Sequence, residues 1–190
     1  LGKGITAKAL KDKFPNATLY DDKDFENYDL QSDELTVVSP GIPPYNNMVL
    51  NSKNVVSDYD LFEDIIPFSI WISGTNGKTT TTQMCQHLLK EYNSVCGGNI
   101  GIPLSSMDEK APIWILETSS FTLHYTNKSK PNIYLLLPIS EDHITWHGSF
   151  KEYQDAKLKP LTLMNENEIA IIPEEFKDIK TNAQVITYKN

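Results

Sequence analysis

Short apolar runs separated by turn residues recur along this chain of 190 residues. Several of the runs are apolar at almost every position, a pattern typical of strands covered on both faces of a mainly parallel sheet. We therefore expect a mainly parallel sheet that is buried on both faces. Six runs are predicted to be β-strands, at residues 35–38, 68–72, 113–116, 133–137, 169–172 and 185–188.

Residues 79–92 follow a helical period instead. Met84, Leu88, Leu89 and Tyr92 fall on one stripe of such a helix. We expect this stripe to face the sheet. A strand, a glycine loop and an amphipathic helix in this order form the first half of a βαβ unit, so the predicted fold class is α/β.

A domain boundary is expected between residues 59 and 67. The composition becomes less acidic there, Pro67 interrupts any helix through residues 61–66, and a new strand follows at once. We predict one domain at residues 1–64 and a second at residues 65–190. We also expect both ends to be cut, because the opening glycine turn has no strand before it and the last strand runs almost into Asn190.

Composition narrows the functional classes. The formal net charge of −8 argues against a nucleic-acid partner. No apolar run approaches the roughly 20 residues that span a bilayer, so membrane insertion is not expected. Cys85 and Cys96 are spaced neither as a CxxC pair nor as a secreted framework, which favours a cytoplasmic protein. All 17 basic residues are Lys, so anions must be held by Lys, metal ions and backbone N–H groups.

The most informative stretch, which we name the phosphate loop, lies between a predicted strand and the predicted helix. Its two glycines allow a tight turn that points backbone N–H groups at an anion beside a helix N-terminus. In the general pattern the lysine reaches the β- and γ-phosphates, and the next residue ligates Mg²⁺. Ile72 stands where that pattern has its first glycine, and the alternative is a turn that only caps the helix. The phosphate loop consists of Gly74, Thr75, Asn76, Gly77, Lys78, Thr79 and Thr80.

Two predicted strands end in polar residues that suit a metal or a substrate. Glu117 follows the run 113–116, where a carboxylate beside a phosphate loop suits Mg²⁺, although a solvent-facing strand end would look the same. His143 follows the run 133–137 and could ligate a second metal or contact a carboxylate under attack; a solvated loop is the alternative. Lys157 has no such signal, because a single Lys on a helix is nearly always solvated.

The N-terminal residues contain three short segments of interest, of which the first two are of kinds that occur in nucleotide-binding folds. They are an incomplete glycine turn, an acidic segment after a possible second strand, and a Pro/Gly-rich turn after the 35–38 strand. Plain turns explain these segments about as well. The residues singled out in them are Thr6, Asp21, Asp22, Lys23, Ser39 and Gly41.

Taken in order, these segments resemble the muramyl ligase superfamily, and within it the branch that adds D-glutamate. The phosphate loop matches the superfamily's loop, and the segment with Glu117 and Ser119 is similar to the D-glutamate branch's own version of the metal-carboxylate segment. The glycine loop around Asn99 matches one that contacts the muramyl substrate, and the segment ending at His143 matches a metal-binding segment. Lys157 falls where the family carries a carbamylated lysine.

The resemblance implies a role for each candidate residue. The phosphate loop would bind ATP. The catalytic residues would be Lys78, Glu117, His143 and Lys157, and the Mg²⁺ ligands Thr79, Glu117, His143 and carbamylated Lys157. The substrate-binding residues would be Thr6, Asp21, Asp22, Lys23, Ser39, Gly41, Asn99, Ser119 and His143.

The resemblance also implies the architecture and the reaction. Residues 1–64 would form a Rossmann-like domain that binds the UDP-substrate, residues 65–190 an incomplete P-loop ATPase domain, and a C-terminal amino-acid-binding domain would be absent. The implied enzyme joins D-glutamate to UDP-N-acetylmuramoyl-L-alanine through an acyl phosphate, with ATP and Mg²⁺, in peptidoglycan precursor synthesis. The fragment by itself is expected to be inactive.

Three positions depart from the D-glutamate branch: Lys23 stands where Arg is common, Thr122 where Gln is common, and Thr145 where Asp often follows the His. The alternatives are therefore another ligase of the superfamily, such as a different muramyl ligase or a folate polyglutamylating enzyme, or a non-catalytic nucleotide-binding module.

Overall fold

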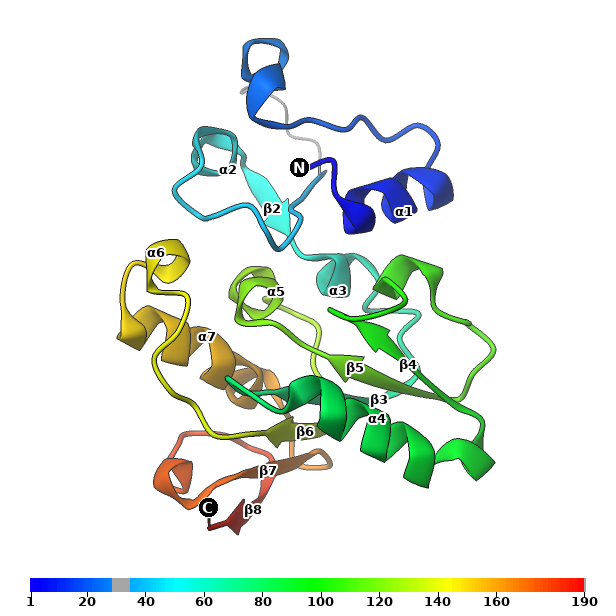
Figure 1. Cartoon of the computed structure of the whole chain (residues 1–190), viewed down its shortest axis with the longest axis vertical. Helices are drawn as coiled ribbons and strands as arrows, with labels where there is room; N and C mark the ends of the chain where they lie inside the picture. Colours follow the sequence, from blue (N-terminus) through cyan, green and yellow to red (C-terminus); the bar gives the residue numbers. More distant parts are fainter. Residues whose placement is uncertain (29–34, 190) are drawn as a thin grey trace.

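A computed structural model of the chain describes residues 1–28 and 35–189, and these residues form two parallel sheets (Figure 1). The smaller sheet lies in the N-terminal part, where β1 and β2 pair with Thr36 opposite Val55. Short helices surround it. The elements of this part are α1 (Ile5–Lys13), η1 (Asp22–Asn27), β1 (Leu35–Val37), α2 (Asn47–Asn51), β2 (Asn54–Val56) and α3 (Asp58–Leu61).

The larger sheet has six parallel strands in the order β4-β5-β3-β6-β7-β8, which confirms the predicted α/β class. Its strands are β3 (Phe68–Ser73), β4 (Ser94–Gly98), β5 (Ile113–Glu117), β6 (Ile133–Leu136), β7 (Ile169–Pro173) and β8 (Gln184–Tyr188). Its helices are α4 (Lys78–Leu88), η2 (Lys90–Tyr92), η3 (Leu104–Ser106), α5 (Ser120–Tyr125), α6 (Ile144–His147), α7 (Phe150–Leu163) and η4 (Glu174–Phe176).

All six predicted strands are present, each within a residue of its expected bounds. The strands β2 and β4 were not predicted. The strand β4 was missed because it contains Gly97 and Gly98, and a pair of glycines is more typical of a loop. The structure explains Gly97, because a Cβ there would lie 2.4 Å from the Met107 sulfur and 2.5 Å from the Ile102 carbonyl oxygen. The backbone passes too close to this turn for a side chain.

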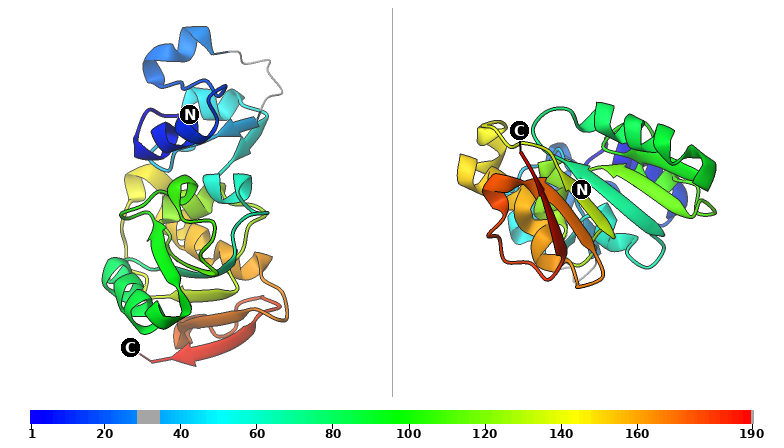
Figure 2. Two further views of the ribbon diagram at one scale, coloured as in Figure 1. Left: turned by 90° about the vertical axis from the view of Figure 1, so that its right-hand side faces the viewer. Right: turned by 90° about the horizontal axis from the view of Figure 1, so that it is seen from below.

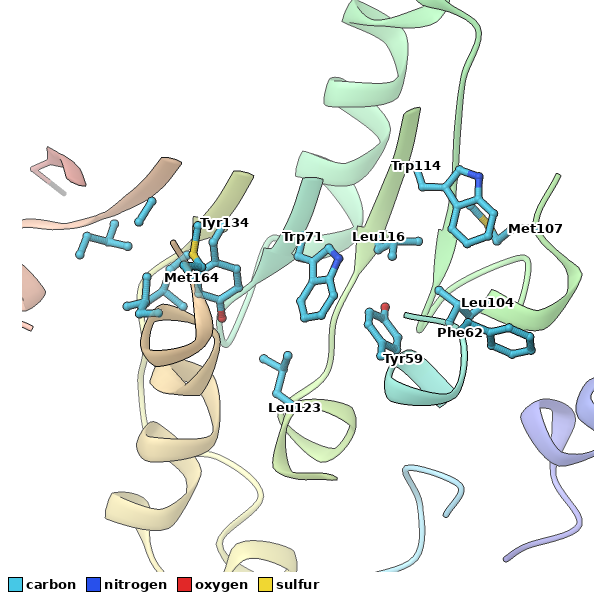
Figure 3. Packing of buried hydrophobic residues seen from close by; sticks show 14 of the residues in the cluster. Tyr59, Phe62, Trp71, Leu104, Met107, Trp114, Leu116, Leu123, Tyr134 and Met164 are labelled. Carbon is cyan, nitrogen blue, oxygen red and sulfur yellow. The ribbon is translucent and has the colours of Figure 1, made fainter. Parts of the chain in front are cut away.

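Helices lie on the two faces of the larger sheet in unequal numbers. On one face α4 packs against β3, β4 and β5. On the other face α5 and α7 pack against each other and cover the main core (Figure 2). Trp71, Tyr134 and Leu123 are fully buried in that core, where the edge of Tyr59 from α3 lies against Trp71 with ring centroids 4.7 Å apart (Figure 3). The short helix α3 thus joins the N-terminal part to the core of the larger sheet.

The predicted inward stripe of α4 is wrong. Met84, Leu88 and Tyr92 are 60%, 73% and 64% exposed. The helix instead turns Thr82 and Cys85 toward the sheet, and only Leu89 of the expected stripe packs there. The phosphate loop fixes where α4 starts and therefore which side of the helix faces the strands. Small side chains such as Thr82 and Cys85 allow the helix to lie close to the sheet.

The expectation that the strands are covered on both faces holds for only part of the sheet. In β3 and β5, Ile72 and Ile115 on the α4 side are as fully buried as Trp71 and Leu116 on the opposite side. In β6 and β7 buried positions alternate with partly exposed ones. Over β6–β8 the described residues place no helix on the α4 side (Figure 1).

Candidate active site

The phosphate loop connects the end of β3 to the start of α4 and requires glycine at two positions. Gly74 has φ +140°, and a Cβ there would lie 2.5 Å from the Cβ of Leu137. Gly77 has φ +83° and is the residue before the helix. Since α4 begins directly after it at Lys78, the free backbone N–H groups of the helix N-terminus point into the loop. The sequence-predicted phosphate loop has the strand-turn-helix context that an anion site needs.

The amine of Lys78 folds back over this loop. It donates hydrogen bonds to the carbonyl oxygens of Gly74, at 3.1 Å, and Thr75, at 2.8 Å. These two contacts hold the cation at the centre of the turn, where a bound polyphosphate would place its negative charge.

Glu117 lies at the end of β5, opposite Ile72 in the sheet register, so its carboxylate reaches the phosphate loop from the neighbouring strand. The side chain is buried, with 2% of the residue exposed. One oxygen accepts from the Thr79 hydroxyl at 2.7 Å, and the other accepts from the Asn99 amide at 3.0 Å. Asn99, predicted to contact the substrate, here orients the carboxylate.

Thr79 and Glu117 fit the ligand chemistry of Mg²⁺. The ion prefers hard oxygen ligands and is commonly held by one or two protein groups together with substrate phosphates. The hydroxyl and the carboxylate lie together beside Lys78, as such a site requires. Among the described residues no group of three His, Cys, Asp or Glu side chains could hold a metal on its own, and waters together with substrate phosphates are the ligands that usually complete such a Mg²⁺ site.

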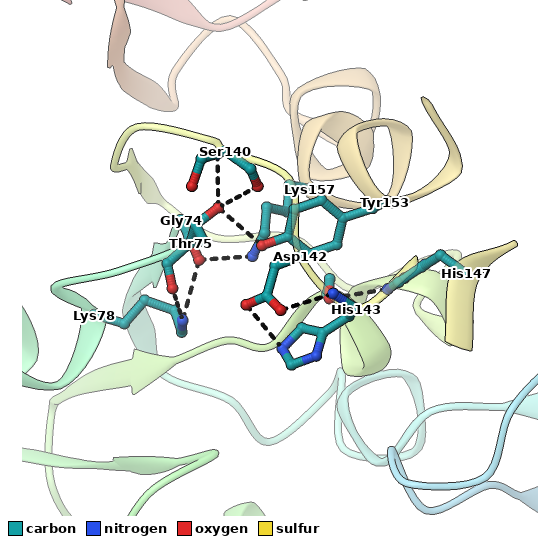
Figure 4. A network of polar contacts seen from close by, with 10 residues as sticks. Gly74, Thr75, Lys78, Ser140, Asp142, His143, His147, Tyr153 and Lys157 are labelled. Carbon is teal, nitrogen blue, oxygen red and sulfur yellow. Dashed lines mark hydrogen bonds and ion pairs between the residues drawn. The ribbon is translucent and has the colours of Figure 1, made fainter. Parts of the chain in front are cut away.

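Lys157 is the least expected residue of the site. It is 1% exposed, and its amine donates to the Gly74 carbonyl oxygen at 2.7 Å, the same oxygen that Lys78 contacts (Figure 4). The amine also lies 4.8 Å from the ring centroid of Tyr153. Burial, and then the positive charge of Lys78, lower the pKa of Lys157 from 10.5 to about 7. A substantial fraction of this lysine is therefore neutral near pH 7.

Tyr153 connects the phosphate loop to helix α7, and we did not predict it. Its hydroxyl lies 2.9 Å from the Thr75 hydroxyl, which also donates to the Ser140 carbonyl and accepts from the Ser140 N–H. Tyr153 and Lys157 stand four residues apart on α7, so both contact consecutive residues of the loop. That spacing was the available signal, but it is common on helices and does not stand out.

His143 lies near this network but is more open. Its side chain is 47% exposed, and its ring nitrogen is 3.5 Å from the Asp142 carboxylate. The residue adopts φ +52°, and its ring centroid lies 4.7 Å from that of Phe121 and 6.1 Å from that of Tyr153. His143 and Lys157 therefore flank the same tyrosine ring (Figure 4).

Ser119 and His147 lie near the start of α5, and their side chains form hydrogen bonds within the protein. The Ser119 hydroxyl caps the helix by accepting from the Thr122 N–H at 3.1 Å. His147, which we did not predict, lies 3.0 Å from the Ser120 hydroxyl through Nε2. Burial, and then nearby His124, lower its pKa to about 4, so the ring is neutral. The Nδ1 atom of His147 is buried and has no partner among the described residues.

The N-terminal candidates lie apart from the phosphate loop, in the upper part of Figure 1. Thr6 is in the first turn of α1, and Asp21 caps η1 by accepting from the Lys23 N–H at 3.1 Å. Ser39 accepts from the Ile42 N–H through its carbonyl at 3.0 Å, and Gly41 is exposed. The side chain of Asp22 lies outside the described part. Their substrate contacts stay a prediction, and so does the domain division at residues 64 and 65.

Two hollows of the surface lie away from these residues. One, of about 430 Å³, lies between α5 and α7 and includes His124, Asp155 and Lys159. Another, of about 570 Å³, lies between α4 and the start of β4 and includes Gln86 and Lys110. Neither is lined by the phosphate loop. Among residues 1–28 and 35–189, none of the helices combines the length and apolarity needed to cross a bilayer.

Residues 72–190 match the family described as "Mur ligase middle domain". This stretch covers more than half of the chain and starts at the end of β3, so it includes the phosphate loop, Glu117, His143 and Lys157. The chain therefore belongs to the Mur ligase family.

Curated relatives agree with this assignment. A UDP-N-acetylmuramoylalanine--D-glutamate ligase from Campylobacter jejuni is 47% identical over 207 residues, which cover 100% of this chain and 52% of that protein. One from Helicobacter pylori is 47% identical over 184 residues, covering 90% of this chain and 43% of that protein. The chain thus spans about half the length of these relatives.

Solved structures of more distant ligases share the fold. The MurF ligase from Thermotoga maritima in complex with ADP has a TM-score of 0.54 at 16% identity, covering 75% of this chain and 43% of that chain. The UDP-N-acetylmuramate:L-alanyl-gamma-D-glutamyl-meso-diaminopimelate ligase from Neisseria meningitides has a TM-score of 0.56 at 14% identity, covering 80% and 57%. At these identities the likeness concerns the fold alone.

Proposed function

We propose that this chain is the nucleotide- and UDP-substrate-binding part of an ATP-dependent ligase that joins D-glutamate to UDP-N-acetylmuramoyl-L-alanine in the cytoplasm, during peptidoglycan precursor synthesis. The observation that carries the proposal is that the phosphate loop, which contains Lys78 and Thr79, is contacted by two residues from other elements. Glu117 of β5 accepts from Thr79, and Lys157 of α7 donates to Gly74. The names of the curated relatives support the choice of substrates.

The first chemical step would convert an unreactive carboxylate into an acyl phosphate. A carboxylate oxygen attacks the γ-phosphorus of ATP, and the bond to the β-phosphate oxygen breaks to release ADP. Lys78 and the loop N–H groups hold the phosphates in position for this transfer. Bound Mg²⁺ would neutralise phosphate charge, and Thr79 and Glu117 are the residues placed to hold it.

The second step would form the amide bond. The amine of D-glutamate attacks the acyl carbon, the bond from that carbon to the phosphate oxygen breaks, and phosphate leaves. The amine must lose a proton on the way. The residues that bind the amino acid would belong to the part of the relatives that this chain does not cover.

Lys157 fits the proposed carbamate. A neutral amine attacks CO₂, forms an N–C bond and loses a proton, which converts a cation into an anionic oxygen ligand. Burial already favours the neutral amine, because it lowers the pKa of Lys157 to about 7. A carbamate at this position would no longer repel Lys78 and would present oxygen atoms beside the phosphate loop.

The test needs a complete enzyme. We would join residues 1–190 to the part of the Campylobacter jejuni relative that lies outside the aligned region, and measure phosphate release with ATP and UDP-N-acetylmuramoyl-L-alanine. Release should depend on D-glutamate and should not occur with L-alanine, diaminopimelate or a folate substrate. Lys157→Ala should abolish turnover, and Lys157→Glu, or Ala with a short carboxylic acid, should restore part of it. Release that prefers another amine would disprove the proposed substrate.

A further inference from the structure

His143 adopts a backbone conformation that its own segment does little to stabilise. Its φ is +52°, in the left-handed region that is uncommon for residues other than glycine. The helix that follows it, α6, is a single turn of four residues and is too short to be stable without tertiary contacts. The His143 side chain is also 47% exposed. The position of His143 therefore depends on the residues that pack against α6.

Phe121 of α5 packs against both His143 and α6. Its ring centroid lies 4.7 Å from that of His143 and 4.7 Å from that of Trp146. A third contact, with centroids 5.7 Å apart, reaches His147. Pairs of rings at these distances attract one another in preferred orientations. Since a phenyl ring can neither transfer a proton nor bind Mg²⁺, its contact with His143 acts on the orientation of the imidazole.

Trp146 connects the same turn of helix to the N-terminal part of the chain. Its backbone N–H donates to the His143 carbonyl at 3.0 Å. Its indole packs against the small apolar cluster that contains Tyr125 of α5, and Ile42 of the N-terminal part packs against that cluster as well. The Tyr125 hydroxyl donates to the Ile42 carbonyl at 2.8 Å. The N-terminal part thus holds α6 through an aromatic cluster.

These contacts join two groups of candidate site residues. Ile42 closes the turn at residues 39–42, because its N–H donates to the Ser39 carbonyl at 3.0 Å. That turn contains Ser39 and Gly41, which are candidates for binding the substrate. His143, at the other end of the path, is a candidate for the reaction itself. The path consists of one hydrogen bond and three ring contacts, through Ile42, Tyr125, Trp146, Phe121 and His143.

We propose that Phe121 and Trp146 are positioning residues for His143. Phe121 fixes the orientation of the imidazole, and Trp146 makes the position of α6 depend on the 39–42 turn. A ligand on that turn, such as the uridine diphosphate end of the substrate, is then linked to the arrangement of His143. The inference rests on the proposed function in one respect, because His143 matters to catalysis only if it takes part in that reaction. The contacts themselves can be measured in this chain without ligase activity.

The first test follows the His143 ring by NMR in this chain with isotope-labelled histidine, and His143→Gln identifies its signals. Phe121→Leu and Trp146→Leu should both move these signals. Phe150→Leu is the matched control, because Phe150 contacts the ring of Tyr153 with centroids 6.4 Å apart, and it should move them at least about threefold less. A cooperative urea transition shows that each variant is folded. If Trp146→Leu does not fold, the milder Trp146→Phe takes its place.

The same signals test the link to the N-terminal part. Ile42→Ala should move the His143 signals at least about threefold further in the wild-type background than in Trp146→Leu. Ile5→Ala, at a position of the N-terminal part that is 77% exposed, should leave them in place. His143 signals that do not respond to Trp146→Leu, or that respond to Ile42→Ala equally in both backgrounds, would overturn the proposal.

The second readout is kinetic and uses the joined enzyme described above. Phe121→Leu should lower kcat by about tenfold or more and change KM for ATP less than about twofold, because its ring contacts lie on His143 and α6. Phe121→Tyr keeps the ring and should restore most of kcat. A normal kcat in Phe121→Leu, with His143→Ala inactive, would overturn the proposal. If His143→Ala is itself active, the role of His143 in the proposed reaction is wrong, and the NMR measurements still decide whether Phe121 and Trp146 position it.

Discussion

The two halves of the larger sheet are equally apolar in sequence and differ in how they are covered. In the half formed by β5 and β3, both faces are buried, and the strand ends carry the phosphate loop and Glu117. In the half formed by β6, β7 and β8, one face is buried beneath α5 and α7, and the other carries partly exposed Leu135 and half-exposed Ile186. The phosphate loop and Glu117 thus lie at the ends of strands that are buried on both faces.

This difference shows that an apolar run and a buried strand report different things. The apolar run is a local property of the sequence, whereas burial depends on which elements of the described residues pack on each face of the strand. Where the two agree, as at β3, the described elements cover both faces of the apolar strand. Where they disagree, as at β7, the described elements cover only one face of an apolar strand.

The largest effect should follow a change in the fully covered half. Gly74→Ala places a Cβ 2.5 Å from that of Leu137 at a backbone angle that only glycine adopts easily. We expect the free energy of unfolding to fall by about 3–5 kcal/mol in urea titrations. Gly101→Ala is the control, because Gly101 also has positive φ but open space around it, and it should cost about 1 kcal/mol. Equal costs would mean that the contact with Leu137 is unimportant.

Truncation of a buried strand residue in the same half should cost slightly less. Ile72→Ala removes a fully buried side chain between α4 and the strands, and we expect a loss of about 2–5 kcal/mol in unfolding free energy. Urea denaturation followed by Trp fluorescence would measure it. A loss below about 1 kcal/mol would contradict the view that this half is closely packed.

The pH dependence of stability should reveal Lys157. Burial lowers its pKa from 10.5 to about 7, so between these values the unfolded chain binds a proton that the folded chain lacks. Stability from this residue is therefore gained as pH rises through that window. Between pH 7 and 9 the wild type should gain about 1–3 kcal/mol relative to Lys157→Met, in buffers free of CO₂. Parallel pH profiles for the two proteins would show that Lys157 is charged when folded.

Glu117→Gln should separate metal from nucleotide binding. It keeps the side-chain shape beside Thr79 and Asn99 but removes the negative charge. The Mg²⁺-dependent part of ATP affinity should fall by about tenfold or more in calorimetry, with little change in Mg²⁺-free binding. Asp155→Asn, on the exposed side of α7, should leave both values unchanged. Equal losses with and without Mg²⁺ would argue against a metal ligand.

The smallest effect is expected in the uncovered half. Ile186→Ala should cost less than about 1 kcal/mol in the chain alone, because the side chain is 53% exposed. A cost in the chain alone as large as that of Ile72→Ala would contradict the difference between the two halves.

The sequence by itself determined the α/β class, six of the eight strands found among the described residues and the phosphate loop, because these depend on local signals. Apolar runs and a glycine loop between a strand and a helix are readable without knowing any neighbour. The resemblance added Lys157, for which the residues gave no reason.

Only the tertiary structure decided the rest, because it depends on which segments meet. The buried side of α4 follows from the way the phosphate loop joins it to β3, so Met84 and Leu88 were misassigned. The pKa of Lys157 is lowered by burial and by the charge of Lys78, which is 79 positions away in sequence. The uncovered face of β6–β8 arises from the direction of the crossovers, a property of the whole sheet that no single strand contains.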